Sequence, residues 1–211
     1  MKKYLKKNKK SIIIVAINTI LFIILSILVL TNTTQTLDTQ FHSLILNIRT
    51  DNLTKILTLI TNLAGASFLL AVSIILLLTI KKRKHAIHIF LNLAISFFIN
   101  EFAKNIFERS RPIGINLIEE TGLSYPSGHA MIGLAFYSFI AYILYKYSKN
   151  KKQKALIITT TILLISIIGF SRIYLGVHYL TDVIAGYLLS IIYLTIFIKL
   201  TQKEKKWSQW K

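Results

Sequence analysis

Residues 155–200 read ALIITTTILLISIIGFSRIYLGVHYLTDVIAGYLLSIIYLTIFIKL. This stretch holds two apolar runs of about twenty residues, and a helix of that length crosses the hydrocarbon core of a bilayer, which is roughly 30 Å thick. Backbone polar groups find no water in lipid, so each run must be helical. The junction between the two runs carries Ser171, Arg172, His178 and Asp182. Ionisable residues in such a position are costly and usually functional, so the junction is a candidate site.

Apolar runs of this kind recur along the chain. The six candidate spans are residues 11–31, 55–80, 86–106, 127–145, 155–175 and 178–200. The chain has 211 residues and is 54% hydrophobic, and so many long apolar runs are typical of a membrane protein. We therefore predict an all-α polytopic membrane protein with six transmembrane helices and short loops. A mildly amphipathic segment within residues 38–54 predicts a short interfacial helix before the second span.

No linker, repeat or low-complexity segment divides the chain, so residues 1–211 are predicted to form a single membrane-embedded domain. Its parts are a core of about 38–200 and basic tails at 1–10 and 201–211. The first apolar run is too long for a signal peptide and no small-residue cleavage site follows it, which favours an uncleaved span. Trp207 and Trp210 suit an interfacial anchor, with a plain polar tail as the alternative.

The charges are distributed unevenly between the two sides of the predicted membrane. Of the 26 Lys and Arg residues, 20 lie in the terminal tails and in the second and fourth connections. The positive-inside rule then places both termini in the cytoplasm and the candidate site at the extracellular face of the membrane. A composition rich in Lys, Ile and Asn is typical of a bacterium with an AT-rich genome, so we expect a bacterial plasma membrane. Topology accounts for the net charge of +18, so nucleic acid is not expected as a partner.

Two cations lie near the start of the third connection, residues 107–126. Lys104 and Arg111 are seven residues apart, about two helical turns, so they can share one face if the helix persists that far. Ammonium and guanidinium groups both bind phosphate oxygens. The alternative is that both are interfacial cations, with Glu101 and Glu108 available to pair with Lys104.

The segment Ser127-Gly128-His129 follows Pro126 and opens an apolar helix. The free amides of a helix N-terminus attract anions, and a glycine there lets the backbone come close to a phosphate. His129 lies on the first turn and can reach the same ligand. The alternative is that Ser127 only caps the helix and that His129 is structural.

His178 and Asp182 are four residues apart and can share one face of a helix. A carboxylate at this spacing can hold the proton on one imidazole nitrogen and leave the other nitrogen free to attack. Metal-dependent phosphatases need several convergent carboxylate or histidine ligands, whereas one carboxylate and three cations gather here. The absence of Cys also excludes thiolate ligands and disulfides. The sequence therefore favours a site without metal or cofactor. Three histidines receive no role: His42, His85 and His88.

These segments are similar to the three signature motifs of the type 2 phosphatidic acid phosphatase superfamily. The motifs are Lys104-x6-Arg111-Pro112, Pro126-Ser127-Gly128-His129 and Ser171-Arg172-x5-His178-x3-Asp182. No defining position is missing, and the resemblance covers the span layout over about residues 38–200. The chain most resembles the bacterial branch of membrane lipid-phosphate phosphatases, which act as phosphatidylglycerophosphatases or undecaprenyl diphosphatases.

The resemblance implies a covalent, metal-independent phosphatase mechanism. His178 would be the nucleophile, Asp182 would orient it, and His129 would protonate the leaving oxygen. The phosphoryl oxygens would be bound by Lys104, Arg111, Ser127, Gly128 and Arg172. Such a site would supply positioning and charge, which provide most of the acceleration in phosphoryl transfer.

The family implies phosphatidic acid, phosphatidylglycerol phosphate or undecaprenyl diphosphate as substrate. A soluble phosphate ester remains an alternative, as does a non-enzymatic lipid transporter or scramblase. Charges near one face and the lack of an inverted repeat argue against transport. The intact His129, His178 and Asp182 argue against a catalytically silent member. Residues 107–126, with Glu119 and Glu120, are expected to be solvated, with a gating role as the alternative. The sequence does not indicate an oligomeric state.

Overall fold

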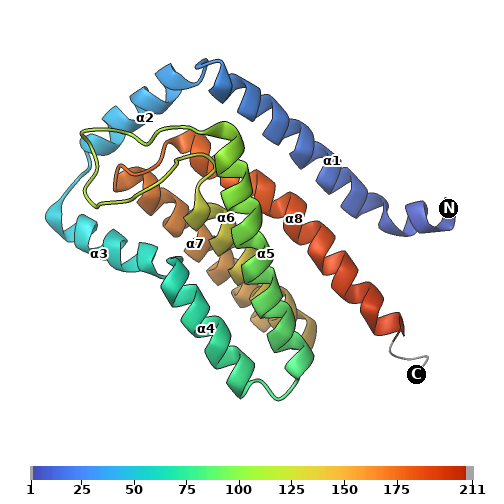
Figure 1. Cartoon of the computed structure of the whole chain (residues 1–211). Helices are drawn as coiled ribbons and strands as arrows, with labels where there is room; N and C mark the ends of the chain where they lie inside the picture. Colours follow the sequence, from blue (N-terminus) through green and yellow to red (C-terminus); the bar gives the residue numbers. More distant parts are fainter. Residues whose placement is uncertain (1, 208–211) are drawn as a thin grey trace.

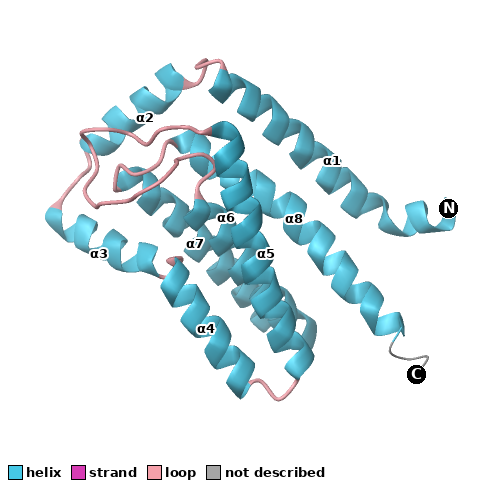
Figure 2. Cartoon of the chain, viewed as in Figure 1, coloured by secondary structure: helices cyan, strands magenta, loops and turns pink. Residues whose placement is uncertain are grey.

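The computed structural model describes residues 2–207, with side chains from Asn8 to Gln202. Within residues 2–207 the chain forms helices and loops and no strand (Figures 1 and 2). The helices are α1 (Lys2–Leu30), α2 (Gln35–Leu46), α3 (Asp51–Asn62), α4 (Ala66–Thr79), α5 (Arg83–Phe107), α6 (Gly128–Tyr147), α7 (Lys151–Tyr174) and α8 (Leu180–Trp207). The all-α prediction is confirmed. The predicted tryptophan anchor lies outside the described part, which excludes Trp210 and the side chain of Trp207.

Among the described residues 2–207, five helices are long and apolar enough to cross a bilayer. These are residues Asn8–Leu30 of α1, all of α5, α6 and α7, and Leu180–Gln202 of α8. Their outer surfaces carry large apolar side chains: Phe98 is 71% exposed and Phe102 is 70% exposed. Lipid tails, rather than water, suit such a surface. In the same part of the chain, the pair α3 and α4, which is bent by 46°, makes a sixth span if the two helices are counted as one.

The bend divides the predicted second span, residues 55–80. Helix α3 ends at Asn62, and Gly65 takes an extended conformation (φ −67°, ψ 144°) before α4 begins. A break of this kind leaves backbone carbonyls without intrahelical partners. The Tyr137 hydroxyl donates to the carbonyl of Leu63 at 2.6 Å and satisfies one of them.

The predicted short helix before the second span is present as α2, earlier in the chain than residues 38–54 suggested. A new helix, α3, begins at Asp51 because Thr50 caps it, with its hydroxyl accepting from the Leu53 amide at 3.3 Å. The buried residues of α2 are Asp38, His42 and Ile45. Two of the three are ionisable, so this helix carries charge towards the interior of the protein.

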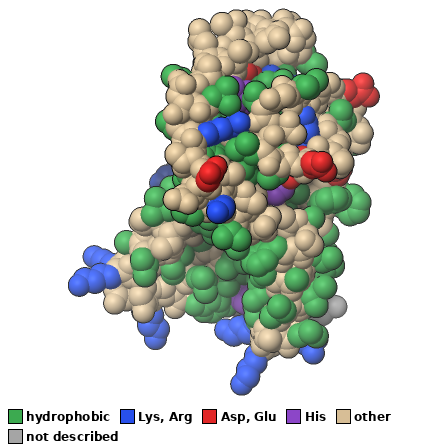
Figure 3. Space-filling view, turned by 90° about the vertical axis from the view of Figure 1, so that its left-hand side faces the viewer, with side chains coloured by type: hydrophobic (Ala, Val, Ile, Leu, Met, Phe, Trp, Pro, Cys, Tyr) green, Lys and Arg blue, Asp and Glu red, His purple; other side chains and the backbone are tan. Residues whose placement is uncertain are grey.

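Helix α6 lies at the centre of the fold, with α5, α7 and α8 packed against it, α1 against α8 and α4 against α5. Large apolar side chains hold this bundle together, among them Phe136, Phe139, Tyr193 and Phe197. The C-terminal ends of α5 and α7 meet the N-terminal ends of α6 and α8 at one end of the bundle, beneath the connection 108–127 (Figure 1). On the face shown in Figure 3, Lys and Arg side chains project from the lower end, and Asp and Glu side chains lie in the upper half.

Candidate active site

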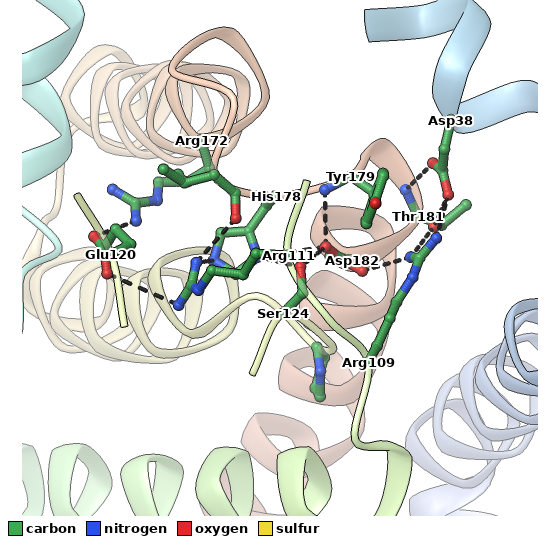
Figure 4. Close-up of polar contacts among 12 residues, drawn as sticks. Asp38, Arg109, Arg111, Glu120, Ser124, Arg172, His178, Tyr179, Thr181 and Asp182 are labelled. Carbon is green, nitrogen blue, oxygen red and sulfur yellow. Dashed lines mark hydrogen bonds and ion pairs between the residues drawn. The ribbon is translucent and has the colours of Figure 1, made fainter. Parts of the chain in front are cut away.

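The three sequence motifs meet at the end of the bundle that the connection 108–127 covers. Lys104 stands on the last turn of α5, Arg172 on the last turn of α7, and Asp182 on the first turn of α8. Figure 4 shows Arg111, Arg172, His178 and Asp182 side by side, together with residues that the motifs do not include.

A tight turn between α7 and α8 directs His178 inwards. Gly176 has a φ of +75°, and a Cβ atom there would lie 2.3 Å from the carbonyl oxygen of Ile115. Only glycine fits a left-handed position that is also crowded by backbone. The imidazole of His42 contacts the carbonyl of His178 at 3.1 Å. The turn is thus held on both sides, and His178 is 1% exposed.

The imidazole of His178 is held at Nδ1. This nitrogen lies 3.4 Å from Oδ2 of Asp182 and 3.3 Å from the hydroxyl of Ser124. Ser124 in turn donates to the same carboxylate oxygen, and the amide of Tyr179 donates to it at 2.8 Å. Because the Ser124 hydroxyl donates its proton to Asp182, Nδ1 of His178 must carry a proton and donate it to Ser124 or Asp182. The predicted His–Asp pairing is therefore present, with Ser124 as an additional member.

The other ring nitrogen, Nε2, faces Arg111. Nη1 of Arg111 lies 3.3 Å from it and can only donate. Nε2 must therefore carry a lone pair, which is the form that can attack an electrophile. Arg111 also donates to the carbonyls of Val177, Thr121 and Gly122 at 2.9, 2.9 and 3.1 Å.

Burial lowers the pKa of His178 from 6.5 to about 4, with the charges of Arg172 and Arg111 acting in the same direction. Asp182 opposes this shift but does not overcome it. The imidazole is therefore neutral at neutral pH. A neutral ring with a free Nε2 is chemically competent as a nucleophile.

Arg172 is fully buried, which is unusual for a charged side chain. Its Nη1 donates to the hydroxyl of Thr61 at 2.9 Å, and its Nη2 donates to the carboxylate of Glu120. The Nε atom is buried and has no hydrogen-bond partner among the described residues. Arg172 therefore keeps unused donor capacity inside the site.

Glu120 is placed differently from the sequence expectation of a solvated connection. Its Oε2 lies 3.8 Å from Arg111, while Oε1 pairs with Arg172. Burial alone would raise the pKa of the Glu120 carboxyl, but Arg172 and Arg111 outweigh burial and hold the pKa below its usual range. Glu119 is exposed. One glutamate therefore enters the site and its neighbour faces solvent.

The start of α6 matches its predicted position. Ser127 occupies the N-cap position without a side-chain cap bond, and its hydroxyl is buried and has no partner among the described residues. A Cβ atom on Gly128 would lie 3.0 Å from Oδ1 of Asn100, so the helix start packs closely against α5. His129 is near enough to Arg172 and His178 to sense their charges.

Lys104 also lies at the end of the bundle that carries the site, but it forms a salt bridge with Glu101 at 3.6 Å. This pair matches the alternative that the sequence left open. The charge of Lys104 still reaches His129, Arg111 and Glu120.

Motif reasoning missed several residues of the site, among them Asp38, Arg109 and Ser124. Arg109 joins the two carboxylates of Asp38 and Asp182 through separate nitrogens. The available signal was that both Asp38 and Arg109 are charged and fall on the predicted outer side. Their contact joins residues that are 71 positions apart, and no local pattern encodes such a pairing. Ser124 had no distinguishing signal.

A buried His–Asp pair, flanked by arginines at one end of a bundle of membrane-spanning helices, defines an integral-membrane enzyme that handles phosphate. A family model described as the PAP2 superfamily matches residues 85–206. The chain belongs to this superfamily, and it is a membrane lipid phosphatase, hence a phosphoric ester hydrolase. The resemblance seen in the motifs is confirmed, and the non-enzymatic alternative loses its basis.

Several relatives support the assignment. The chain is 32% identical over 195 residues to phosphatidylglycerophosphatase B of Bacillus subtilis, covering 89% of this chain and 95% of the relative. It is 33% identical over 146 residues to undecaprenyl-diphosphatase of Sulfolobus acidocaldarius, covering 65% and 66%. The crystal structure of a transmembrane PAP2 type phosphatidylglycerolphosphate phosphatase from Bacillus subtilis superposes with a TM-score of 0.83 at 29% identity, covering 90% of this chain and 96% of that one. Aquifex aeolicus LpxE shares the fold, with a TM-score of 0.63 at 24% identity over 77% of this chain and 95% of that one.

Proposed function

We propose that this protein hydrolyses the phosphate monoester or diphosphate of a membrane lipid through a phosphohistidine on His178, at the outer face of the bacterial plasma membrane. The observation that carries the proposal is the orientation of His178. Its Nδ1 is held by Asp182 and Ser124, and its Nε2 faces Arg111 in the region where Arg172 also lies. The candidate substrates are undecaprenyl diphosphate, phosphatidylglycerol phosphate and phosphatidic acid.

In the first step Nε2 of His178 forms a bond to phosphorus, and the bond from phosphorus to the lipid oxygen breaks. His129, which is protonated when the anionic phosphoryl group is bound, gives a proton to the departing oxygen and becomes neutral. The lipid therefore leaves as an alcohol or, from a diphosphate, as a monophosphate. Arg111, Arg172 and Lys104 stabilise the charge that gathers on the phosphoryl oxygens. Asp182 stabilises the imidazole as it becomes positively charged.

In the second step a water molecule attacks the phosphohistidine. The oxygen of the water bonds to phosphorus, the nitrogen–phosphorus bond breaks, and the proton of the water goes to His129. Inorganic phosphate leaves, and both histidines return to their starting forms. Splitting a difficult hydrolysis into two easier transfers is what covalent catalysis provides.

The test is phosphate release by the purified full-length protein in detergent and excess chelator. The three lipids are compared with a soluble phosphate ester under the same conditions. Release from at least one lipid, preserved in chelator, is the expected result, and the order of kcat/KM identifies the substrate. Preference for the soluble ester would overturn the lipid assignment, and loss of activity in chelator would overturn the metal-independent mechanism.

Glu120 occupies the arginines that the phosphoryl group needs, so the substrate has to displace it. We expect Glu120→Gln to lower KM by roughly 3- to 10-fold, because a neutral amide competes less well for two cations. The amide keeps a hydrogen-bonding oxygen for Arg172, which limits any loss of stability. Inhibition by inorganic phosphate should become stronger by a similar factor.

The matched control is Glu119→Gln, which removes the same charge from the neighbouring exposed position. It should leave KM and phosphate inhibition unchanged. Equal effects of the two substitutions would show that the general charge of the connection matters and that the contacts of Glu120 do not.

The proposed orientation in the membrane can be tested with single cysteines, because the natural chain has none. Ile113 is 91% exposed in the connection that covers the site, and Lys82 is exposed in the α4–α5 connection at the other end. We expect a membrane-impermeant maleimide to label Ile113→Cys on intact cells and to label Lys82→Cys only after the cells are opened. The reverse pattern would place the site in the cytoplasm.

A further inference from the structure

A second charge cluster lies behind Asp182, on the side away from His178. Arg109 joins two carboxylates there (Figure 4). Its Nη1 donates to Oδ1 of Asp182 at 2.6 Å, and its Nη2 donates to Oδ2 of Asp38 at 2.7 Å. The same Nη1 donates to the hydroxyl of Thr181 at 2.7 Å, and the guanidinium lies 4.0 Å from the centre of the Tyr179 ring. The guanidinium is thus held on several sides and its orientation is restricted.

Asp38 ties this cluster to the start of α8. Its Oδ1 accepts from the amide of Thr181 at 3.1 Å, and its Oδ2 accepts from the Thr181 hydroxyl at 2.7 Å. A carboxylate that accepts a first-turn amide acts as a cap for the helix, here supplied from another helix. Asp182 is the next residue on that turn, so α2 and Arg109 together set where its carboxylate lies.

The two oxygens of Asp182 therefore have different partners. Oδ2 takes the bonds from Ser124, Tyr179 and His178, and Oδ1 takes the bond from Arg109. Asp38 and Asp182 are at most 1% exposed, so water cannot solvate their carboxylates in place of Arg109. Two carboxylates share one guanidinium, which leaves the cluster one negative charge in excess. That excess lies next to the imidazole that becomes positively charged in the proposed reaction.

We propose that Arg109 and Asp38 are positioning residues, which fix the carboxylate of Asp182 and set the net charge behind His178, so that Nε2 is aimed at the phosphorus. This inference rests on the proposed role of His178. It also gives α2 a function, because the short helix brings Asp38 to the site.

The charge argument gives opposite expectations for the two residues. Arg109→Met leaves two carboxylates without a counterion, and their negative charge favours a proton on His178. The pH at which kcat/KM falls on the acid side (the acid limb) should therefore rise from near 4 by about one unit or more. Asp38→Asn removes the excess negative charge, which disfavours a proton on His178 and moves the acid limb to lower pH. Other groups that face His178 are unchanged in both variants: Arg172 from α7, His129 from α6, His42 from α2, and Arg111, Glu120 and Ser124 from the connection 108–127.

The experiment measures kcat, KM and the pH profile of phosphate release from the best lipid substrate, using the full-length protein in detergent. We expect Arg109→Met to lower kcat by roughly 10- to 100-fold with KM changed by less than about threefold, as for residues that orient a catalytic group. Arg109→Lys should keep the acid limb near its natural position and restore part of kcat. Arg49→Met is the matched control, since Arg49 donates to the carbonyl of Tyr174 and supports the same end of the bundle. It should leave the pH profile in place.

If Arg109→Met does not fold, Arg109→Lys and Asp38→Asn still report on kcat and on the acid limb. If the wild-type enzyme is active but the Arg109 and Asp38 variants keep the wild-type kcat and an unshifted pH profile, this inference is overturned. The proposed function is not affected by that result. If the Arg109 and Asp38 variants change kcat, KM and the pH profile no more than Arg49→Met does, both residues have only a structural role. A natural protein that releases no phosphate would overturn the proposed function, and this inference with it.

Discussion

Replacing His178 by alanine is expected to lower kcat by about 10⁴-fold or more, because the variant has no atom to receive the phosphoryl group. The loss should appear in kcat, since the arginines that we propose to bind phosphate remain. With a lipid carrying labelled phosphate, the natural protein should retain an acid-labile, base-stable label after rapid quenching, and the variant should retain none. The measurement is a single-turnover assay in detergent.

His85→Ala is the control, because His85 lies at the other end of the bundle and contacts the Tyr147 hydroxyl at 2.7 Å. Its kcat should stay within about twofold of the natural value. Both variants should unfold near the natural temperature in detergent, which separates chemistry from folding. A folded His178→Ala enzyme with more than a few per cent of natural activity would contradict a nucleophilic role.

Arg172→Lys is expected to lower kcat/KM by about 10²- to 10³-fold, although the charge is retained. The guanidinium uses one nitrogen on Thr61 and keeps others for an anion, and an ammonium group cannot serve both directions. The fully buried position leaves no water to fill the missing contacts. The inhibition constant of inorganic phosphate should rise together with KM, which a defect limited to the chemical step would not produce.

Arg83→Lys, at the exposed start of α5, is the matched control and should not change kcat/KM. Thr61→Val removes only the hydroxyl that holds Nη1, so a smaller loss, roughly 3- to 30-fold, is expected from it. Natural kinetics in Arg172→Lys would show that Arg172 stabilises the fold through Glu120 and does not bind the phosphoryl group.

The sequence predicted the helical class well because lipid leaves the backbone few choices, and long apolar runs report the spans directly. It did not predict the 46° break between α3 and α4. Hydropathy does not respond to Gly65, which changes the backbone path without changing the apolar character of the run. The start of α3 at Asp51 was missed for a similar reason, since the cap at Thr50 starts a second helix inside what looked like one amphipathic segment.

By itself the sequence determined the class of the protein and the identity of its motif residues, because apolar length and the spacing of polar groups along one helix are local properties. Only the tertiary structure decided which charges meet. Glu120 turned towards Arg172 while Glu119 turned away, and Asp38 met Arg109 across 71 positions of chain. Buried charges must find partners wherever the packed helices bring them. That requirement acts through space, so no pattern along the chain records its outcome.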